Sequence, residues 1–367
     1  MDETTKRKLL EKNKKLINMV IERVKLDFPN DIVLIGLTGS FLHDDYHEKS
    51  DLDLCIVHDT VPFGKLWETF IFDDVVYSFF YISWDNLERK ASLDVVGVSG
   101  LTDTQVIYCT KPEAFERFNN LKEKAQMLMA EPIGKASLDR TKRHIDLAKQ
   151  EYANAAISCD IGKVRYASCR LLFNLINALV SLNNTCIKQG IKRYLDEVLE
   201  YRHLPENFYS KHMSVIDAKT IFEIQNASLA LLSSVTQLYD TMCKRYIPKP
   251  APTASNLTGT YELLWGTCRA KLIASIALGD KSYIFHAARD AQSNLYEIAA
   301  NNGTKVYDIM QYFDADNPEI LLDELHKAIY EYGIECGKNG YTIARYDTFK
   351  ALYEHCMAKI ENSKETI

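Results

Sequence analysis

The chain is 367 residues long, 47% of its residues are hydrophobic and 26% are charged, and its net charge at pH 7 is −6. This length suits two or three domains with substantial cores, and the net acidity argues against a nucleic-acid partner, because phosphate backbones select basic surfaces. The nine cysteines are odd in number and lack CxxC or zinc-type spacing, which indicates reduced thiols rather than a disulfide framework. Residues 1–6 lack the apolar core of a signal peptide, and no apolar run is long enough to span a membrane. We therefore expect a cytoplasmic protein without a membrane partner.

The first 130 residues mix helix and strand patterns. A helical period of apolar residues runs from Lys8 to Phe28, and Pro112 opens a second helix that runs toward Met129. Between these helices, apolar and β-branched runs predict strands at residues 32–35, 51–57, 75–82 and 105–109. This order of elements predicts an N-terminal α/β domain with a small mixed sheet over residues 1–130.

Helical periodicity replaces the strand pattern after residue 134. The predicted helices lie at residues 138–158, 161–182, 190–202 and 214–244. Residues 247–253 contain three prolines, which cannot continue a helix and form a stiff linker, and the chain is again helical from 258 to 362. The predicted fold class is therefore α+β, with all-α helical bundles at 135–247 and 255–367 following the α/β domain.

The two helical regions share a pattern in which a helix, an aspartate and a small-residue helix with an arginine follow one another. Asp160 precedes Arg165 and Arg170 in the first region, and Asp280 precedes Arg289 in the second. A divergent repeat and a chance similarity between amphipathic helices explain this pattern equally well.

Two aspartates stand close together on the second predicted strand. Asp51 and Asp53 are separated by one residue, and side chains i and i+2 of a strand point to the same face. Two unpaired carboxylates would repel each other there and resist desolvation. A hard divalent cation such as Mg²⁺, with phosphate oxygens completing its coordination, would relieve this repulsion.

The same aspartates belong to a longer motif. A strand ends in Gly39 and Ser40, and after nine further residues Ser50, Asp51 and Asp53 begin the next strand. This arrangement resembles the nucleotidyltransferase superfamily related to DNA polymerase β, and most of all its minimal and aminoglycoside (antibiotic) nucleotidyltransferase branch. The resemblance implies that Gly39, Ser40 and Ser50 bind the triphosphate of a nucleotide. It implies that Asp51 and Asp53 are catalytic and bind the Mg²⁺ ions that bridge the phosphates.

Part of the first helical region carries a looser resemblance. Residues 179–205 are similar to the substrate-binding domains of aminoglycoside nucleotidyltransferases and to related HEPN-like bundles. Arg140 and His144 are too closely spaced for the motif of HEPN ribonucleases, which argues against a nuclease.

The third carboxylate of the superfamily has no clear counterpart in this sequence. Aligning residues 76–83 by their apolar pattern places Ser78 where the acid is expected, and serine cannot act as a general base at neutral pH. Asp74 lies on the same strand face, but roughly 13 Å away along the strand. Glu151 and Asp146, on the first helix after the boundary, are alternative bases, although each also fits an ordinary solvated helix residue.

Two histidines follow the glycine-serine turn. His43 and His47 flank two aspartates at helical spacing, which is compatible with a metal pair. No third ligand stands at a matched spacing, so we interpret them as polar residues at the mouth of the site.

The sequence thus predicts a Mg²⁺-dependent nucleotidyltransferase that moves a nucleoside monophosphate, AMP from ATP or that of another NTP, to a hydroxyl of a small molecule. The resemblance implies an aminoglycoside-like acceptor and antibiotic resistance, and ligand pockets favour domain interfaces, here between the α/β domain and the first bundle. The alternatives are an antitoxin-type enzyme that nucleotidylates a protein, a non-catalytic nucleotide-binding relative and a helical scaffold. The acceptor, the preferred nucleotide, the general base and the oligomeric state stay open.

Overall fold

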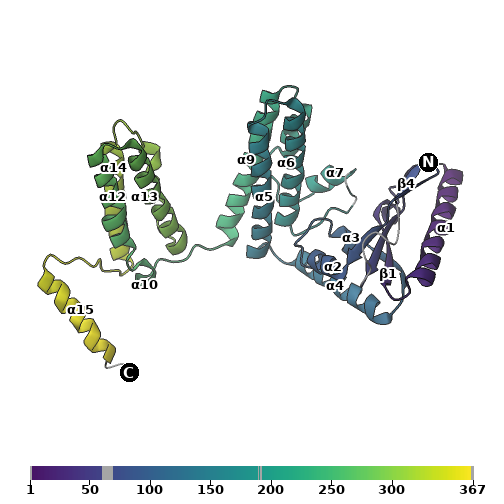
Figure 1. Cartoon of the computed structure of the whole chain (residues 1–367), viewed down its shortest axis with the longest axis horizontal. Coiled ribbons are helices and arrows are strands. Elements are labelled where there is room, and N and C mark those ends of the chain that lie inside the picture. The colour runs from purple at the N-terminus through teal and green to yellow at the C-terminus, as the bar shows by residue number, and fades with distance from the viewer. Residues whose placement is uncertain (1, 60–68, 189, 191, 365–367) are drawn as a thin grey trace. The chain divides into compact units, whose positions relative to one another are not determined.

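The computed structural model describes residues 2–59, 69–188, 190 and 192–364. The chain divides into two compact units, Met1–Ile247 and Pro248–Ile367, and the boundary lies in the predicted proline linker (Figure 1). The predicted α+β fold class, a small mixed sheet followed by helices, is confirmed. The separation of the first unit into domains at 1–130 and 135–247 stays a prediction.

A mixed sheet forms the centre of the N-terminal region. Its strands lie in the order β5-β2-β1-β6. The central strand β1 (Ile32–Thr38) pairs antiparallel with β2 (Asp53–His58) on one side and with β6 (Gln105–Cys109) on the other. Strand β5 (Phe80–Ser83) runs parallel to β2 on its outer side. The strands predicted on both sides of the glycine-serine turn are present, but the second begins at Asp53, so the prediction that Asp51 also lies on that strand is wrong.

Helices cover both faces of this sheet, which explains the continuous apolar runs of its inner strands. Helix α1 (Glu3–Asp27) packs Leu16, Val20 and Val24 against one face. Helices α2 (Trp84–Ala91) and α4 (Pro112–Ala130) belong to the core on the other face. Figure 1 shows the sheet between these two helical layers.

The single strand predicted at 75–82 is wrong, because the structure contains two strands there. Strand β4 (Val75–Tyr77) pairs with β3 (Phe70–Phe72) in a separate two-stranded sheet, whereas β5 joins the main sheet. Asp73 and Asp74 form the hairpin turn between β3 and β4, and both have φ of 55°, as two-residue hairpin turns of type I′ require. The apolar pattern continues through Ser78 and therefore could not reveal the change of sheet.

Three long helices form the bundle that completes the first unit. They are α5 (Lys135–Ala156), α6 (Ile161–Leu182) and α9 (Ile221–Tyr246), which share one apolar core. Two shorter helices, α7 (Tyr194–Leu199) and α8 (Phe208–Asp217), pack against that core.

Two helix predictions in this region need correction. The helix predicted at 214–244 is broken between α8 and α9, because the Thr220 side chain accepts a hydrogen bond from the Glu223 amide while Glu223 caps the Thr220 amide. Such a capping box starts a new helix. Of the helix predicted at 190–202, the described part is helical only in α7.

The second unit is helical. Its helices are α10 (Ala254–Leu257), α11 (Thr260–Glu262), the π-helical turn η2 (Leu263–Cys268), α12 (Arg269–Leu278), α13 (Lys281–Asn302), the 3₁₀ turn η3 (Met310–Tyr312), α14 (Glu319–Lys338) and α15 (Phe349–Lys364). Asp160 caps α6 and Asp280 caps α13 through their side chains, so both halves of the suspected repeat use the same cap. No helix among the described residues combines the length and apolarity needed to cross a membrane.

Candidate active site

The glycine-serine turn directly follows the central strand. Gly39 opens a short 3₁₀ helix, η1 (Gly39–His43), with φ of 77°. The preceding residue, Thr38, pairs with Asp53 across β1 and β2. A β-carbon on Gly39 would lie 2.0 Å from Oδ2 of Asp53. Glycine is therefore required twice here, for the left-handed backbone and for the close approach of the carboxylate.

The two predicted metal ligands are close enough for the charge of one to affect the pKa of the other. Asp53 is the first residue of β2, and Asp51 precedes the strand by two residues. Burial, together with the negative charge of Asp51, raises the pKa of Asp53 to about 6, and the positive charge of Lys192 opposes this effect. A half-buried carboxylate beside a second negative charge favours a nearby cation.

A cavity of about 370 Å³ opens at this point. Its walls include all the predicted site residues, namely Gly39, Ser40, Ser50, Asp51 and Asp53. Lys49, Lys188 and Lys192 also line it. Lysine ammonium groups beside a carboxylate pair suit a ligand that carries both phosphate groups and a metal ion.

The donor set fits Mg²⁺. Among the residues that the structure describes, no group of three His, Cys, Asp or Glu side chains forms a metal cage. Mg²⁺ does not need one, because it is commonly held by one or two carboxylates together with substrate phosphates and waters. Asp51 and Asp53, with the raised pKa of Asp53, match that requirement. Their metal-binding role stays a prediction.

Ser50 has a structural task as well as its predicted one. Its hydroxyl accepts a hydrogen bond from the His47 amide at 2.9 Å, and its own amide donates to the His47 carbonyl at 2.9 Å. The imidazole Nδ1 of His47 accepts from the Lys49 amide at 3.1 Å. These bonds close the loop immediately before Asp51 and hold that carboxylate at the cavity.

Ser78 lies where the alignment by apolar pattern placed it, so a serine occupies the position at which the third carboxylate was expected. Cys55 of β2 pairs with Phe80 of β5, and continuing this parallel register by two residues sets Ser78 beside Asp53. Ser78 is exposed and precedes β5. It is not among the residues that line the cavity, so it contributes no group to the site.

The other acids considered as bases lie elsewhere. Asp74 stands exposed in the β3-β4 turn, 3.8 Å from Nζ of Lys49. Glu151 forms an ion pair with Arg170, and Asp146 pairs with lysines of its own helix. None of the three lines the cavity.

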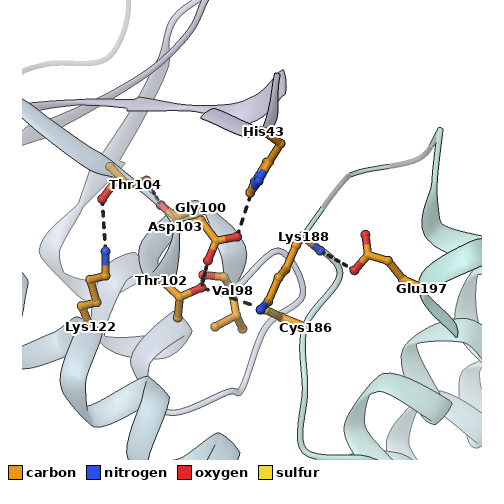
Figure 2. Close-up of polar contacts among 10 residues, drawn as sticks. All are labelled: His43, Val98, Gly100, Thr102, Asp103, Thr104, Lys122, Cys186, Lys188 and Glu197. Carbon is orange, nitrogen blue, oxygen red and sulfur yellow. Dashed lines mark hydrogen bonds and ion pairs between the residues drawn. The ribbon is translucent and has the colours of Figure 1, made fainter. Parts of the chain in front are cut away.

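A carboxylate that the sequence analysis missed does line the cavity. Asp103 follows the short helix α3 (Ser99–Thr102), and its Oδ1 accepts a hydrogen bond of 2.9 Å from the Thr102 hydroxyl. Its Oδ2 is buried and lies 3.6 Å from Nε2 of His43. Figure 2 shows the His43 ring directed at this carboxylate. The pair combines an imidazole and an orienting acid in the wall of the cavity.

The place of Asp103 follows from the sheet. β6 pairs Gln105 with Leu37, and continuing this register places Asp103 beside Gly39, on the side of β1 opposite Asp53. Asp103 precedes β6 by two residues just as Asp51 precedes β2. This shared spacing of two residues before a strand was the only sign of Asp103 in the sequence. It becomes informative once β6 is known to pair with β1.

A mixed sheet with a glycine turn, and with several aspartates and lysines around one cavity, suits a ligand that carries phosphate groups and a metal ion. Residues 17–107 match the sequence profile of the nucleotidyltransferase domain family. This part of the chain belongs to the nucleotidyltransferase superfamily, as its motif predicted.

A solved structure, the nucleotidyltransferase-like protein from Exiguobacterium sibiricum 255-15, is similar over 88% of this chain and 92% of that chain, with 10% identity and a TM-score of 0.32. No curated protein matches the chain.

Proposed function

We propose that the protein is a Mg²⁺-dependent nucleotidyltransferase that moves AMP from ATP to a hydroxyl of a small molecule. The observation that carries this proposal is the contact of the Gly39 backbone with the Asp53 carboxylate in a lysine-lined cavity. The nucleotidyltransferase domain match over residues 17–107 supports it.

Several groups in the cavity would act in this reaction. Asp51 and Asp53 would hold Mg²⁺, which would supply positive charge to neutralise the phosphates. The amides and hydroxyl of the turn at Gly39 and Ser40 donate to phosphate oxygens. The lysines of the cavity, Lys49, Lys188 and Lys192, balance the remaining charge of the triphosphate.

The acceptor hydroxyl oxygen forms a bond to the α-phosphorus, the bond from that phosphorus to the bridging oxygen breaks, and pyrophosphate leaves. The hydroxyl proton goes to a base, and His43 is the group best suited to accept it. Nε2 of His43 lies 3.6 Å from Oδ2 of Asp103, and in the tautomer protonated at Nε2 the other ring nitrogen, Nδ1, carries the free lone pair. Asp103 would hold the ring in this tautomer and stabilise the imidazolium that forms.

The test is direct binding of Mg²⁺–ATP by calorimetry together with pyrophosphate release in the presence of candidate acceptors. Asp53→Ala should abolish both, while Asp73→Ala, a change in the exposed β3-β4 turn, should affect neither. Asp103→Asn should retain Mg²⁺–ATP binding and lower the rate by roughly 10²-fold or more. Equal binding by wild type and Asp53→Ala would refute the proposal.

A second candidate is a non-catalytic nucleotide-binding protein. The serine at position 78, where the alignment expects an acid, favours it. It predicts Mg²⁺–ATP binding that depends on Asp53 without pyrophosphate release from wild type. An unchanged rate in His43→Ala and Asp103→Asn, in a protein that does release pyrophosphate, would count against the proposed base alone.

A further inference from the structure

A second and larger cavity lies in the first unit, next to the cavity that contains Gly39 and Asp53. Its volume is about 680 Å³, within the range of roughly 300–1,000 Å³ that small-molecule sites occupy. Ser99 and Gly190 line both cavities. A molecule bound in the larger cavity therefore adjoins the place where the phosphates are expected.

The walls of this cavity are mainly aliphatic and follow one helix. From Arg165 to Ser181, α6 contributes a stripe of side chains along one face, and these sixteen steps span about 24 Å at the helical rise. Val96 and Val98 face it from the loop before α3, and Val215 and Ile216 from α8. The cavity suits an elongated apolar body.

The charged side chains among the described residues that line this cavity are all positive. Arg140 and Arg165 line it, and no Asp or Glu stands among the described lining residues. Arg140 is half-buried and donates a hydrogen bond of 2.9 Å to the Asn184 side chain. Burial lowers the pKa of Arg140. Because a half-buried guanidinium is stabilised by an anionic partner, this arrangement favours a ligand with an acidic group.

The neighbouring imidazole adds an unpartnered polar atom. His144 lies one helical turn after Arg140 on α5, and its Nδ1 is buried without a hydrogen-bond partner. His144 lines the same cavity. A polar ligand group placed beside Arg140 would satisfy this atom too.

We propose that this cavity binds the acceptor of the nucleotidyl transfer, and that the acceptor is an elongated amphipathic anion with a hydroxyl group rather than a polycation. This assignment rests on the proposed function, in which that hydroxyl attacks the α-phosphorus and releases pyrophosphate. An aminoglycoside-like acceptor, which the family resemblance implied, would place ammonium groups beside two arginines, in a cavity whose described lining residues include no carboxylate.

The probe for this proposal is 12-hydroxydodecanoate, which has an apolar chain, a carboxylate and a hydroxyl. Calorimetry on the full-length protein would compare it with 12-amino-1-dodecanol, of equal chain length and opposite charge, and with kanamycin. We expect the hydroxy acid to bind at least about tenfold more tightly than the amine, and kanamycin not to enter.

Matched variants locate the binding. Arg140→Gln should remove most of the preference for the anion, whereas Arg143→Gln, on the exposed side of the same helix, should keep it. Phe173→Glu, at an exposed residue of the cavity wall, should weaken binding of the hydroxy acid about tenfold or more. Tyr166→Glu, at an exposed residue of α6 outside the wall, should not.

Mg²⁺–ATP binding is measured separately on the same protein. Equal affinity for the hydroxy acid and the amine, or tighter binding of kanamycin, would overturn the proposed acceptor class even where Mg²⁺–ATP binds. Anion-selective binding by a protein that does not bind Mg²⁺–ATP would overturn the nucleotidyl transfer, and with it the role as acceptor. Asp53→Ala should bind the hydroxy acid like wild type and fail to bind Mg²⁺–ATP.

Discussion

Replacing Gly39 with alanine tests how the central strand and the carboxylate site depend on each other. The residue has φ of 77°, and a left-handed backbone costs a residue with a β-carbon roughly 1–2 kcal/mol. The added β-carbon would lie 2.0 Å from Oδ2 of Asp53, where ordinary contact begins at 3.4 Å. The shortfall is 3.4 − 2.0 = 1.4 Å, so the carboxylate must move or the turn must shift.

Both effects have a measurable size. A loss of about 1–2 kcal/mol in a unit of this length lowers the melting temperature by roughly 2–8 °C. A displacement of about 1 Å at a reacting centre lowers the rate by about 10²-fold. We therefore expect Gly39→Ala to fold with a lower melting temperature and to lack the thermal stabilisation by Mg²⁺–ATP that the proposed function predicts for wild type. That stabilisation is about 2.7 kcal/mol when the ligand is at 100 times its Kd.

Gly97→Ala is the matched control. Gly97 also has a positive φ, of 74°, but its β-carbon would meet only Nζ of Lys90, at 3.5 Å. This variant should show a similar fall in melting temperature and keep the stabilisation by Mg²⁺–ATP. The argument that Gly39 makes room for Asp53 would be refuted if Mg²⁺–ATP stabilised Gly39→Ala as much as wild type. It would also be refuted if both variants lost the stabilisation by Mg²⁺–ATP to the same extent.

Other changes test separate parts of the structure. Ser78→Ala should leave Mg²⁺–ATP affinity within about twofold of wild type, as is usual for an exposed side chain, and a larger loss in calorimetry would mean that the serine acts in the site. Gly303→Ala should lower the stability of the second unit more than Gly279→Ala in denaturant titrations. Both glycines end helices with positive φ, but a β-carbon on Gly303 would lie 1.8 Å from the carbonyl oxygen of Pro250, whereas Gly279 faces open space. Equal losses of stability in the two variants would contradict this explanation. Burial lowers the pKa of His212 below its unfolded value of about 6.5. As the pH falls through about 6.5, the unfolded chain therefore binds a proton at this histidine that the folded chain does not bind. The free energy of unfolding decreases as a result. His212→Gln should reduce the slope of stability against pH between about pH 7 and 5.5, and an unchanged slope would exclude this histidine as its source.

The strands on either side of the glycine-serine turn could be predicted from local sequence. The strand before Gly39 and the strand that carries Asp53 are both continuous apolar runs, and each is flanked by residues of turn chemistry. Short-range patterns of this kind specify where a strand begins. The residues in and next to these two strands that line the candidate site could therefore be found from the motif alone.

Residues that reach the site only through the pairing of distant strands could not be predicted from the sequence. Asp103 lies fifty residues beyond Asp53 in the chain, and it reaches the cavity only because β6 pairs with β1. The strand at 75–82 failed for a related reason, since its residues divide between two sheets while the apolar pattern stays unbroken. Which strands become neighbours depends on tertiary packing, which periodicity does not encode.

The cavity along α6 was hidden by a similar ambiguity. A helix with apolar residues around most of its circumference is expected to be buried on all sides, and the interior face of α6 is indeed core. Phe173 lies on α6 and is 57% exposed, yet it forms part of the cavity wall. An apolar residue in a helix pattern can thus serve a core or a ligand, and the charges around it decide between them.

A bulge in the central strand unites these features of the site. On the β6 side, Ile35 pairs with Tyr108 but Gly36 pairs with Val106, so the register shifts by one residue. Without this shift, Thr104 rather than Asp103 would stand beside Gly39, and a shift of one residue turns every side chain of a strand to the opposite face. Gly36 permits the arrangement, because a β-carbon there would lie 2.2 Å from the methyl group of Thr104. One glycine thus brings Asp103 to the cavity from β6, and Gly39 accommodates Asp53 from β2, so both flanking carboxylates depend on residues of the central strand and its turn that have no side chain.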